Sequence, residues 1–192
     1  MTATCNLALA LVHYPVYNKH REVVTTAVTN LDIHDIARAA RTFGLTRYYL
    51  VTPSGEQQTM IRRIVHHWQD GWGASYNPDR REALGIIRIV SSLEEASSDL
   101  QQDFSAPVIT VATGARQRAD TVSFTELRRQ LQQPDTPRLL TFGTGWGLTD
   151  ALFEQADAIL EPIRGAGSYN HLSVRSAVAI MLDRLLSGEN DR

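Results

Sequence analysis

One segment near the start of the chain has side chains suited to binding nucleic acid. HYPVYNKHR, over 13–21, combines two tyrosines, two histidines, an asparagine and two basic residues. Aromatic rings and cations together suit base stacking and phosphate contact. A surface loop tethered by its tyrosines is the structural alternative. We predict RNA contacts from five of its residues: Tyr14, Tyr17, Asn18, Lys19 and Arg21.

Three later segments have the composition of ligand-binding loops. TVATG (110–114) and TFGTGWGL (141–148) place small residues after apolar runs, and these allow a ligand to approach the backbone closely. LEPIRGAGSYNHLSVR (160–175) gathers several polar residues before the last helix, although a helix cap needs only one. None of the three is a Walker or dinucleotide motif, because the required spacings are absent.

Apolar runs alternate with amphipathic stretches along the chain. We predict strands over 7–12, 47–52, 85–90, 106–112, 138–142 and 157–160. We predict helices over 32–43, 57–68, 150–156 and 172–186, with two more beginning near 91–95 and at the capping-box sequence 123–126. Segment 71–81 is predicted to be a mobile loop. The pattern indicates one α/β domain over 1–192, with a mainly parallel six-stranded sheet covered by helices on both faces.

The predicted sheet determines where the chemistry should take place. In open parallel sheets, ligands bind at the carboxyl ends of the strands. The four segments described above each follow or contain the end of a predicted strand. We therefore expect them to lie along one edge of the sheet.

Composition excludes several classes of protein. The chain has 192 residues, 43% of them hydrophobic, and a formal net charge of −2, so it is not a basic nucleic-acid coat. Cys5 is its single cysteine, which excludes a disulfide framework and a cysteine-clustered zinc site. No apolar run is long enough to span a membrane. We expect a cytoplasmic protein.

The basic residues are almost all arginines, because Lys19 is the only lysine among 19. Arginine binds phosphate in a bidentate manner and stacks on bases, so the bias fits an RNA-binding protein. Genomic base composition is the favoured explanation, because the arginines are spread along the chain. Arg62 and Arg63 lie beside two histidines on a predicted helix. We predict that they also contact RNA.

Four long motifs resemble one family. HYPVYNK (13–19), TNLDIHDIARAARTFG (29–44), FGTGWGL (142–148) and EPIRGAGSYNHLSVRSA (161–177) occur in order and span nearly the whole chain. With them the chain resembles the SPOUT, or α/β-knot, superfamily of S-adenosylmethionine-dependent RNA methyltransferases. Within it, the chain looks like the compact bacterial family related in name to tRNA guanine-N1 methyltransferases.

The resemblance implies a C-terminal trefoil knot, a homodimer with a shared active site, and S-adenosylmethionine as methyl donor, with no metal. It places the donor in the three late loops. The residues it implies there are Thr113, Gly114, Phe142, Gly143, Thr144, Gly145, Gly147, Glu161, Pro162, Ile163, Gly165, Asn170, Leu172 and Ser173. We expect a valine at Gly145 to fill the donor's space without unfolding the chain.

The resemblance also suggests residues for catalysis. Arg38 lies five residues before Phe43-Gly44, as an arginine does in the ribose-methylating branch, and Ser168-Tyr169-Asn170 matches that branch's third motif. Arg38 would orient the target phosphate or base. The candidates for the remaining catalytic roles are Asp32, His34 and His171 as the base, together with Asn170.

The substrate and the class of function stay open at this point. The FGTGWGL loop lacks the glutamate of the ribose-methylating branch, so both a base nitrogen such as guanine N1 and a ribose 2′-hydroxyl remain targets, in tRNA or rRNA. A non-catalytic nucleotide- or RNA-binding α/β module is the alternative function. Binding of S-adenosylmethionine separates the two classes.

Overall fold

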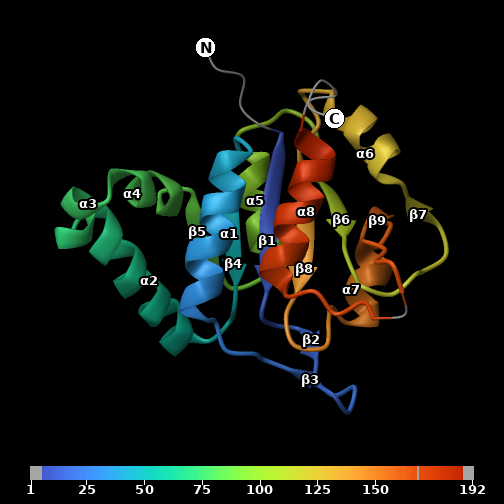
Figure 1. The fold of residues 1–192 in the computed structure, drawn as a ribbon, viewed down its shortest axis with the longest axis horizontal. Helices are drawn as coiled ribbons and strands as arrows, with labels where there is room; N and C mark the ends of the chain where they lie inside the picture. Colours follow the sequence, from blue (N-terminus) through green and yellow to red (C-terminus); the bar gives the residue numbers. More distant parts are fainter. Residues whose placement is uncertain (1–5, 168, 188–192) are drawn as a thin grey trace.

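The computed structural model describes residues 6–167 and 169–187; Cys5 and Ser168, named above, lie outside this part. Seven strands form one sheet in the order β5-β4-β1-β8-β6-β9-β7, and every pairing within it is parallel (Figure 1). The strands are β1 (Leu7–Val12), β4 (Tyr48–Val51), β5 (Ile87–Val90), β6 (Ile109–Ala112), β7 (Thr121–Val122), β8 (Arg138–Gly143) and β9 (Ala158–Leu160). The α/β class and the mainly parallel sheet are confirmed.

Strand β1 lies in the interior of the sheet, and all six of its residues are buried. Its sequence LALALV is apolar on both faces, as a parallel strand covered on both sides requires. It pairs with β4 on one side and with β8 on the other, where Val12 lies opposite Gly143. This register brings the segments that follow β1 and β8 to the same edge.

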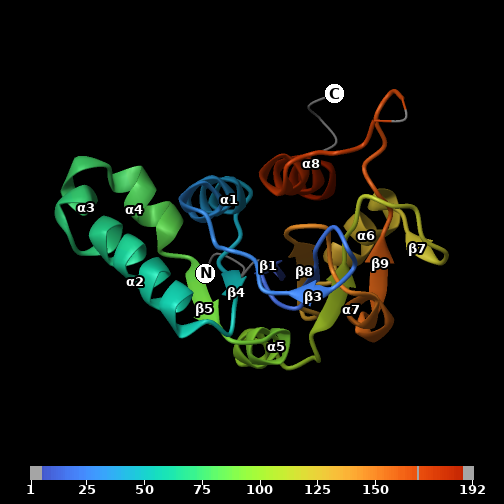
Figure 2. The same cartoon turned by 90° about the horizontal axis from the view of Figure 1, so that it is seen from below.

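Helices cover the sheet on both faces, as predicted. Apolar residues of α1, α2, α4, α6 and α8 join one core, and those of α5 and α7 join the other. Figure 2 shows α5 across the sheet from α1 and α8. The bounds are α1 (Asn30–Thr42), α2 (Gly55–Gln69), α4 (Pro78–Leu84), α5 (Leu93–Gln101), α6 (Phe124–Leu131), α7 (Asp150–Gln155) and α8 (Val174–Leu186).

Hydroxyl side chains cap most of the longer helices. Thr29, Ser54, Ser92, Ser123 and Ser173 each accept a hydrogen bond from the amide three residues later. The cap at Ser123 confirms the helix start predicted there. Helix α8 begins at Val174, after its cap, so Leu172 precedes the helix that was predicted to include it.

The structure differs from the predicted elements in two places and adds a third element that was not predicted. The sheet has seven strands and not six, because β7 is only two residues long and gives no periodic signal. Segment 71–81 is not a loop but holds α3 (Trp72–Tyr76) and the start of α4. HYPVYNKHR contributes to a second, two-stranded sheet, in which β2 (Val16–Tyr17) pairs with β3 (Val23–Val24).

Candidate functional site

The three loops predicted to bind the donor meet at one edge of the sheet. They follow β8, β6 and β9, which are neighbours in a parallel arrangement, so their carboxyl ends lie together. The Asn170 side chain joins two of these loops by donating its Nδ2 to the Ala115 carbonyl at 2.9 Å. Arg164 makes a second link, 3.1 Å from Nη2 to Oε1 of Gln117. We call this region the donor edge.

The segment after β1 closes one side of the donor edge. The Tyr17 amide donates to the Gly147 carbonyl at 2.9 Å, and the Trp146 amide donates to the Tyr17 carbonyl at 2.9 Å. Val16 also forms a β-bridge with Leu148. The HYPVYNKHR segment therefore braces the glycine loop rather than standing free.

The glycines of this loop are required by its close packing. A Cβ at Gly143 would lie 2.5 Å from the Leu148 nitrogen, so no side chain fits there. Gly145 and Gly147 have φ values of +59° and +103°, which favour glycine. A Cβ at Gly145 would approach the Tyr17 carbonyl to 3.0 Å. Our expectation for a valine at Gly145 was therefore wrong in its reason: the side chain would strain the backbone and press on the hairpin.

Unbonded amides make the donor edge suitable for an uncharged or polar ligand. Within residues 6–167 and 169–187, the backbone amides of Gly114, Ile163 and Leu172 make no hydrogen bond. The amides of Thr144, Trp146 and Gly147 bond within the protein instead. The loops after β6 and β9 thus offer more donors to a ligand than the glycine loop does. This arrangement fits the adenosyl part of S-adenosylmethionine, whose ring nitrogens and hydroxyls accept hydrogen bonds.

The remaining predicted donor-binding residues lie along the same edge. Thr113 is buried and donates its hydroxyl to the Thr141 carbonyl at 2.9 Å. Glu161 accepts from the Phe124 amide at 2.8 Å, which fixes the start of the loop after β9. Five others differ in exposure: Phe142, Pro162 and Ile163 are buried, and Gly165 and Leu172 are exposed.

A buried histidine lies behind the glycine loop. His13 Nδ1 is 3.1 Å from the Thr26 hydroxyl, which is 2.5 Å from that of Thr144, and Thr144 donates to the Val12 carbonyl at 3.0 Å. Burial lowers the pKa of His13 to about 4, against the opposing effects of Asp32 and Thr26. His13 is therefore neutral at pH 7 and stabilises the loop through hydroxyl groups.

Asp150 gathers charge at the start of α7. Its carboxylate lies 2.8 Å from Arg118 and 2.5 Å from Arg21, and it accepts from the Tyr17 hydroxyl at 3.3 Å. The Arg118 guanidinium also lies 3.6 Å from the ring centre of Phe153. The hydrogen bond from Arg118, with help from Arg21, lowers the pKa of Asp150. The carboxylate thus joins the segments after β1 and β6 to α7.

The catalytic candidates are separated in space. Asp32 is buried, and its two oxygens bond to Arg175 at 2.8 Å and to the Thr29 hydroxyl at 2.6 Å. Arg38 and His34 line a cleft between α1 and α2, away from the donor loops. His171 is exposed, with its ring 5.3 Å from that of Tyr169. Arg175, which ties α8 to α1 through Asp32, was not singled out from the sequence.

The predicted RNA contacts also fall into two groups. Arg21 is paired with Asp150, Asn18 donates to Glu22 at 2.7 Å, and Lys19 and Tyr14 are exposed. Arg62 and Arg63 lie on α2. No residue of 13–21 lines the clefts beside α2, so the structure does not bring the two groups together.

Two kinds of feature are absent from the described part of the chain. Among the described residues, no group of three or more histidine, cysteine or acidic side chains is placed to hold a metal ion. No helix in residues 6–167 and 169–187 is long and apolar enough to cross a membrane.

Comparisons with known proteins agree with this geometry. The chain is 49% identical over 181 residues to a tRNA (guanine-N(1)-)-methyltransferase from Oleidesulfovibrio alaskensis, which covers 94% of the chain but only 42% of that relative. An uncharacterised protein from Aquifex aeolicus is 41% identical over 95% of the chain and 89% of its own length. The chain therefore spans about two fifths of the first relative.

The fold also matches solved structures. The structure of TrmJ from Z. mobilis superposes with a TM-score of 0.61 at 20% identity, covering 95% of this chain and 69% of that one. The model of the family described as SAM-dependent RNA methyltransferase matches residues 6–187. The chain thus belongs to the family of SAM-dependent RNA methyltransferases, whose methyl donor is S-adenosylmethionine.

Proposed function

We propose that this chain transfers a methyl group from S-adenosylmethionine to a nucleotide of tRNA. The observation that carries the proposal is the donor edge, where three loops meet and two of them, after β6 and β9, carry unbonded amides, within a chain of this family. The identity to relatives named tRNA (guanine-N(1)-)-methyltransferase supports guanine N1 as the target. A ribose 2′-hydroxyl and an rRNA substrate are the alternatives that the experiment below separates.

The donor would be held mainly by backbone groups. S-adenosylmethionine supplies an electrophilic methyl group on a sulfonium, which an acceptor attacks in line. The amides of Gly114, Ile163 and Leu172 can donate to the adenosine, and buried Ile163 and Phe142 offer apolar surface. Neutral backbone dipoles suit a cationic sulfonium better than arginine side chains would. Two arginines beside the edge, Arg21 and Arg118, share the Asp150 carboxylate, which offsets part of their charge.

The acceptor must lose a proton as the methyl group arrives. Asp32 is poorly suited to take it, because both carboxylate oxygens already bond to Arg175 and Thr29. His171 is exposed on the loop after β9, and among the described residues its one side-chain contact is the ring contact with Tyr169. We therefore assign the base role to His171. Arg38, whose guanidinium is exposed on α1, would orient the target nucleotide.

The proposal includes the trefoil knot and the homodimer that the family resemblance implies. The bonds from Asn170 and Arg164 to segment 115–117 support a tightly engaged C-terminal loop. Exposed Leu172 lies just before α8, where a second copy would cover it. A dimer would also bring one copy's Arg38 toward the other's donor edge. An RNA substrate places the reaction in the cytoplasm.

Methylation of unmodified tRNA with isotope-labelled S-adenosylmethionine tests this function. The products would be digested to nucleosides and identified by mass spectrometry. We expect labelled 1-methylguanosine. A labelled 2′-O-methylnucleoside would move the target to the ribose, and label on rRNA alone would replace the substrate. Absence of label on either RNA, with the donor bound, would favour the non-catalytic module.

A further inference from the structure

A basic cleft lies beside the sheet, away from the donor edge. Helix α4 packs against both α1 and α2 (Figure 2). A cleft of about 480 Å³ opens among the three helices. Its lining includes Arg38 from α1, Arg63 from α2 and Arg80 from α4. We call it the arginine cleft. No residue of the loops after β6, β8 or β9 lines it.

The three guanidinium groups have no acidic partner. Within residues 6–167 and 169–187, no ion pair involves Arg38, Arg63 or Arg80, whereas Arg41, on α1, pairs with Glu82 at 2.6 Å. The one carboxylate in the lining, Asp35, is 3.5 Å from Arg175. Three guanidinium groups therefore face one carboxylate in the described lining, and the cleft has an excess of positive charge. Such a site favours an anion.

An aromatic side chain holds the cationic groups in place. The Arg80 guanidinium lies 4.4 Å from the centre of the Trp68 ring, and the rings of His34 and His67 meet Trp68 edge-on at 5.6 and 5.1 Å. The Nε atom of Arg80 and the Nδ1 atom of His34 are buried without a hydrogen-bond partner in the described part of the chain. Buried polar groups are rarely left without a hydrogen-bond partner, and such groups mark this cleft as a candidate site.

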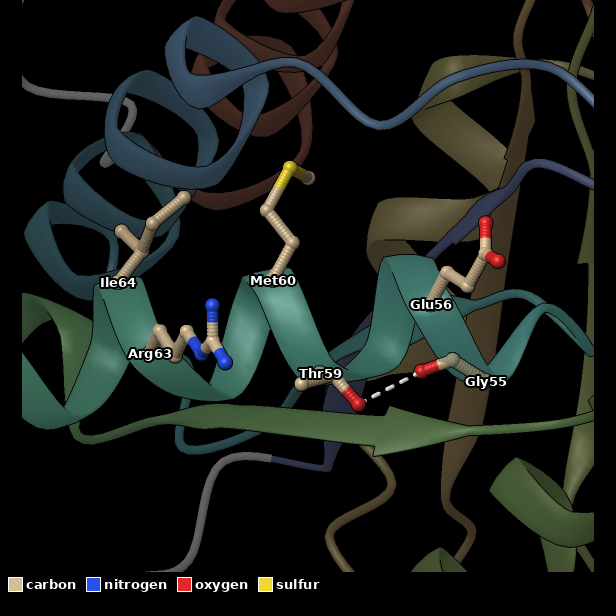
Figure 3. Close-up of a pocket in the computed structure, with 6 residues that line it drawn as sticks. All are labelled: Gly55, Glu56, Thr59, Met60, Arg63 and Ile64. Atoms are coloured by element: carbon tan, nitrogen blue, oxygen red, sulfur yellow. Dashed lines mark hydrogen bonds between the residues drawn. The ribbon is translucent and has the colours of Figure 1, made fainter.

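The cleft continues into a second hollow, and the two together form a surface longer than a single small anion would occupy. Gly55, Met60 and one carboxylate, Glu56, line that hollow, and Arg63 and Ile64 belong to both. Figure 3 shows Met60 and Ile64 rising from α2 on the side that faces α1, with Arg63 on the same helix. An elongated ligand with phosphates and apolar rings matches this alternation better than inorganic phosphate does.

We propose that the arginine cleft binds a single-stranded segment of the RNA substrate, with its phosphates on Arg63, Arg80 and Arg38. The inference rests on the proposed function and deepens it by locating substrate contacts outside the donor edge. Guanidinium groups bind phosphate oxygens in a bidentate manner, and exposed apolar side chains such as Met60 would pack on a base.

Two neighbouring arginines of α2 provide a matched test. Arg63 lines the cleft, whereas Arg62 does not and donates to Gln58 on its own helix at 3.0 Å. Arg63→Gln and Arg62→Gln remove the same charge from adjacent exposed positions. Binding of a short fluorescein-labelled single-stranded RNA would be measured by anisotropy across a salt series, alongside calorimetric binding of S-adenosylmethionine.

We expect the double variant Arg63→Gln/Arg80→Gln to bind RNA roughly tenfold more weakly at low salt, with a log–log salt slope reduced by about 1.4. Arg62→Gln should change RNA affinity by less than about twofold, and donor affinity should be unchanged in all variants. Equal losses in Arg62→Gln and Arg63→Gln would overturn the cleft, as would unchanged RNA binding by the folded double variant. Displacement of RNA by a polyglutamate peptide or inorganic phosphate at equal charge concentration would also overturn it.

The outcome can be separated from that of the proposed function. If wild type methylates RNA but the double variant keeps its KM for RNA, the cleft is wrong and the function stands. If the double variant loses RNA affinity but wild type transfers no methyl group, the cleft stands and the catalytic function fails. If wild type binds no RNA at any salt concentration, both are overturned.

Discussion

Arginine side chains differ between the donor edge and the arginine cleft, because they are ion-paired at the first and have no ion pair in the second. Around Asp150, the guanidinium groups of Arg21 and Arg118 share one carboxylate and brace three segments. In the cleft, Arg63 and Arg80 form no ion pair with a carboxylate of the described chain, and their guanidinium groups remain available to a ligand. The difference comes from partners distant in sequence, since Asp150 lies 129 residues from Arg21. The same residue type is structural in one region and suited to substrate binding in the other.

The largest effect should come from charging the interior of the donor edge. Burial holds the pKa of His13 near 4, below its ordinary value of 6.5. As the pH falls, His13 is protonated in the unfolded chain before it is protonated in the folded chain. The folded state therefore has its full stability above pH 6.5 and loses stability as the pH falls toward 4. We expect the free energy of unfolding to decrease by roughly 3 kcal/mol over that range from this group.

Urea unfolding at several pH values measures that decrease. The matched control is His13→Gln, which keeps a hydrogen-bond donor for Thr26 but cannot titrate. The variant should have a shallower dependence on pH between 6.5 and 4. Identical slopes for the two proteins would show that His13 does not carry the effect.

A second change removes Arg175, which joins α8 to α1 through Asp32 and Asp35. Arg175→Ala leaves the Asp32 carboxylate, only 7% exposed, without its ion-pair partner. We expect the free energy of unfolding to fall by about 2 kcal/mol, below the full cost for a buried pair because Arg175 is 32% exposed. Adding Asp32→Asn should restore part of the loss. A double variant less stable than Arg175→Ala alone would contradict this.

A smaller effect, with opposite signs in two assays, is expected at Asp150. Asp150→Asn releases Arg21 and Arg118 from their shared carboxylate. The loops should loosen, so donor affinity should fall about threefold, while the freed arginines should strengthen RNA binding about twofold at low salt. Calorimetry and anisotropy measure the two. Weaker binding of both ligands would mean that Asp150 only maintains the fold.

The smallest effect should come from the exposed tip of the HYPVYNKHR segment. The double variant Lys19→Gln/Arg21→Gln removes one free charge and one that Asp150 already neutralises. RNA binding should weaken, but by less than about threefold at low salt, and the loss should fade as salt rises. A loss of RNA affinity as large as that of Arg63→Gln/Arg80→Gln would show that the two regions contribute equally to RNA binding, which would contradict the contrast drawn between them.

Much of the fold can be predicted from the sequence because strands and helices here have strong local signals. LALALV is apolar throughout, and Ser123 begins α6 as a capping residue should. Segment 71–81 was misjudged because glycine, asparagine and proline also mark helix boundaries. Gly71 caps α3, and Asn77 caps α4 with Pro78 in its first turn.

The site is only partly predictable, because its contacts join distant segments. The strand ends indicate correctly that the late loops share one edge. Nothing in the local sequence shows that Trp146 bonds to Tyr17 or that Arg175 reaches Asp32. The arginine cleft is equally hidden, since Arg80 lies in a segment that was predicted to be a loop.

The central claim is that donor and RNA are held by separate regions, and one pair of variants tests it directly. Asn170→Ala breaks the bond to Ala115 at the donor edge, and Arg63→Gln changes only the cleft. Both affinities would be measured for both proteins. We predict that Asn170→Ala weakens donor binding several-fold with RNA affinity unchanged, and that Arg63→Gln does the reverse. Parallel losses of both ligands in either folded variant would contradict the account.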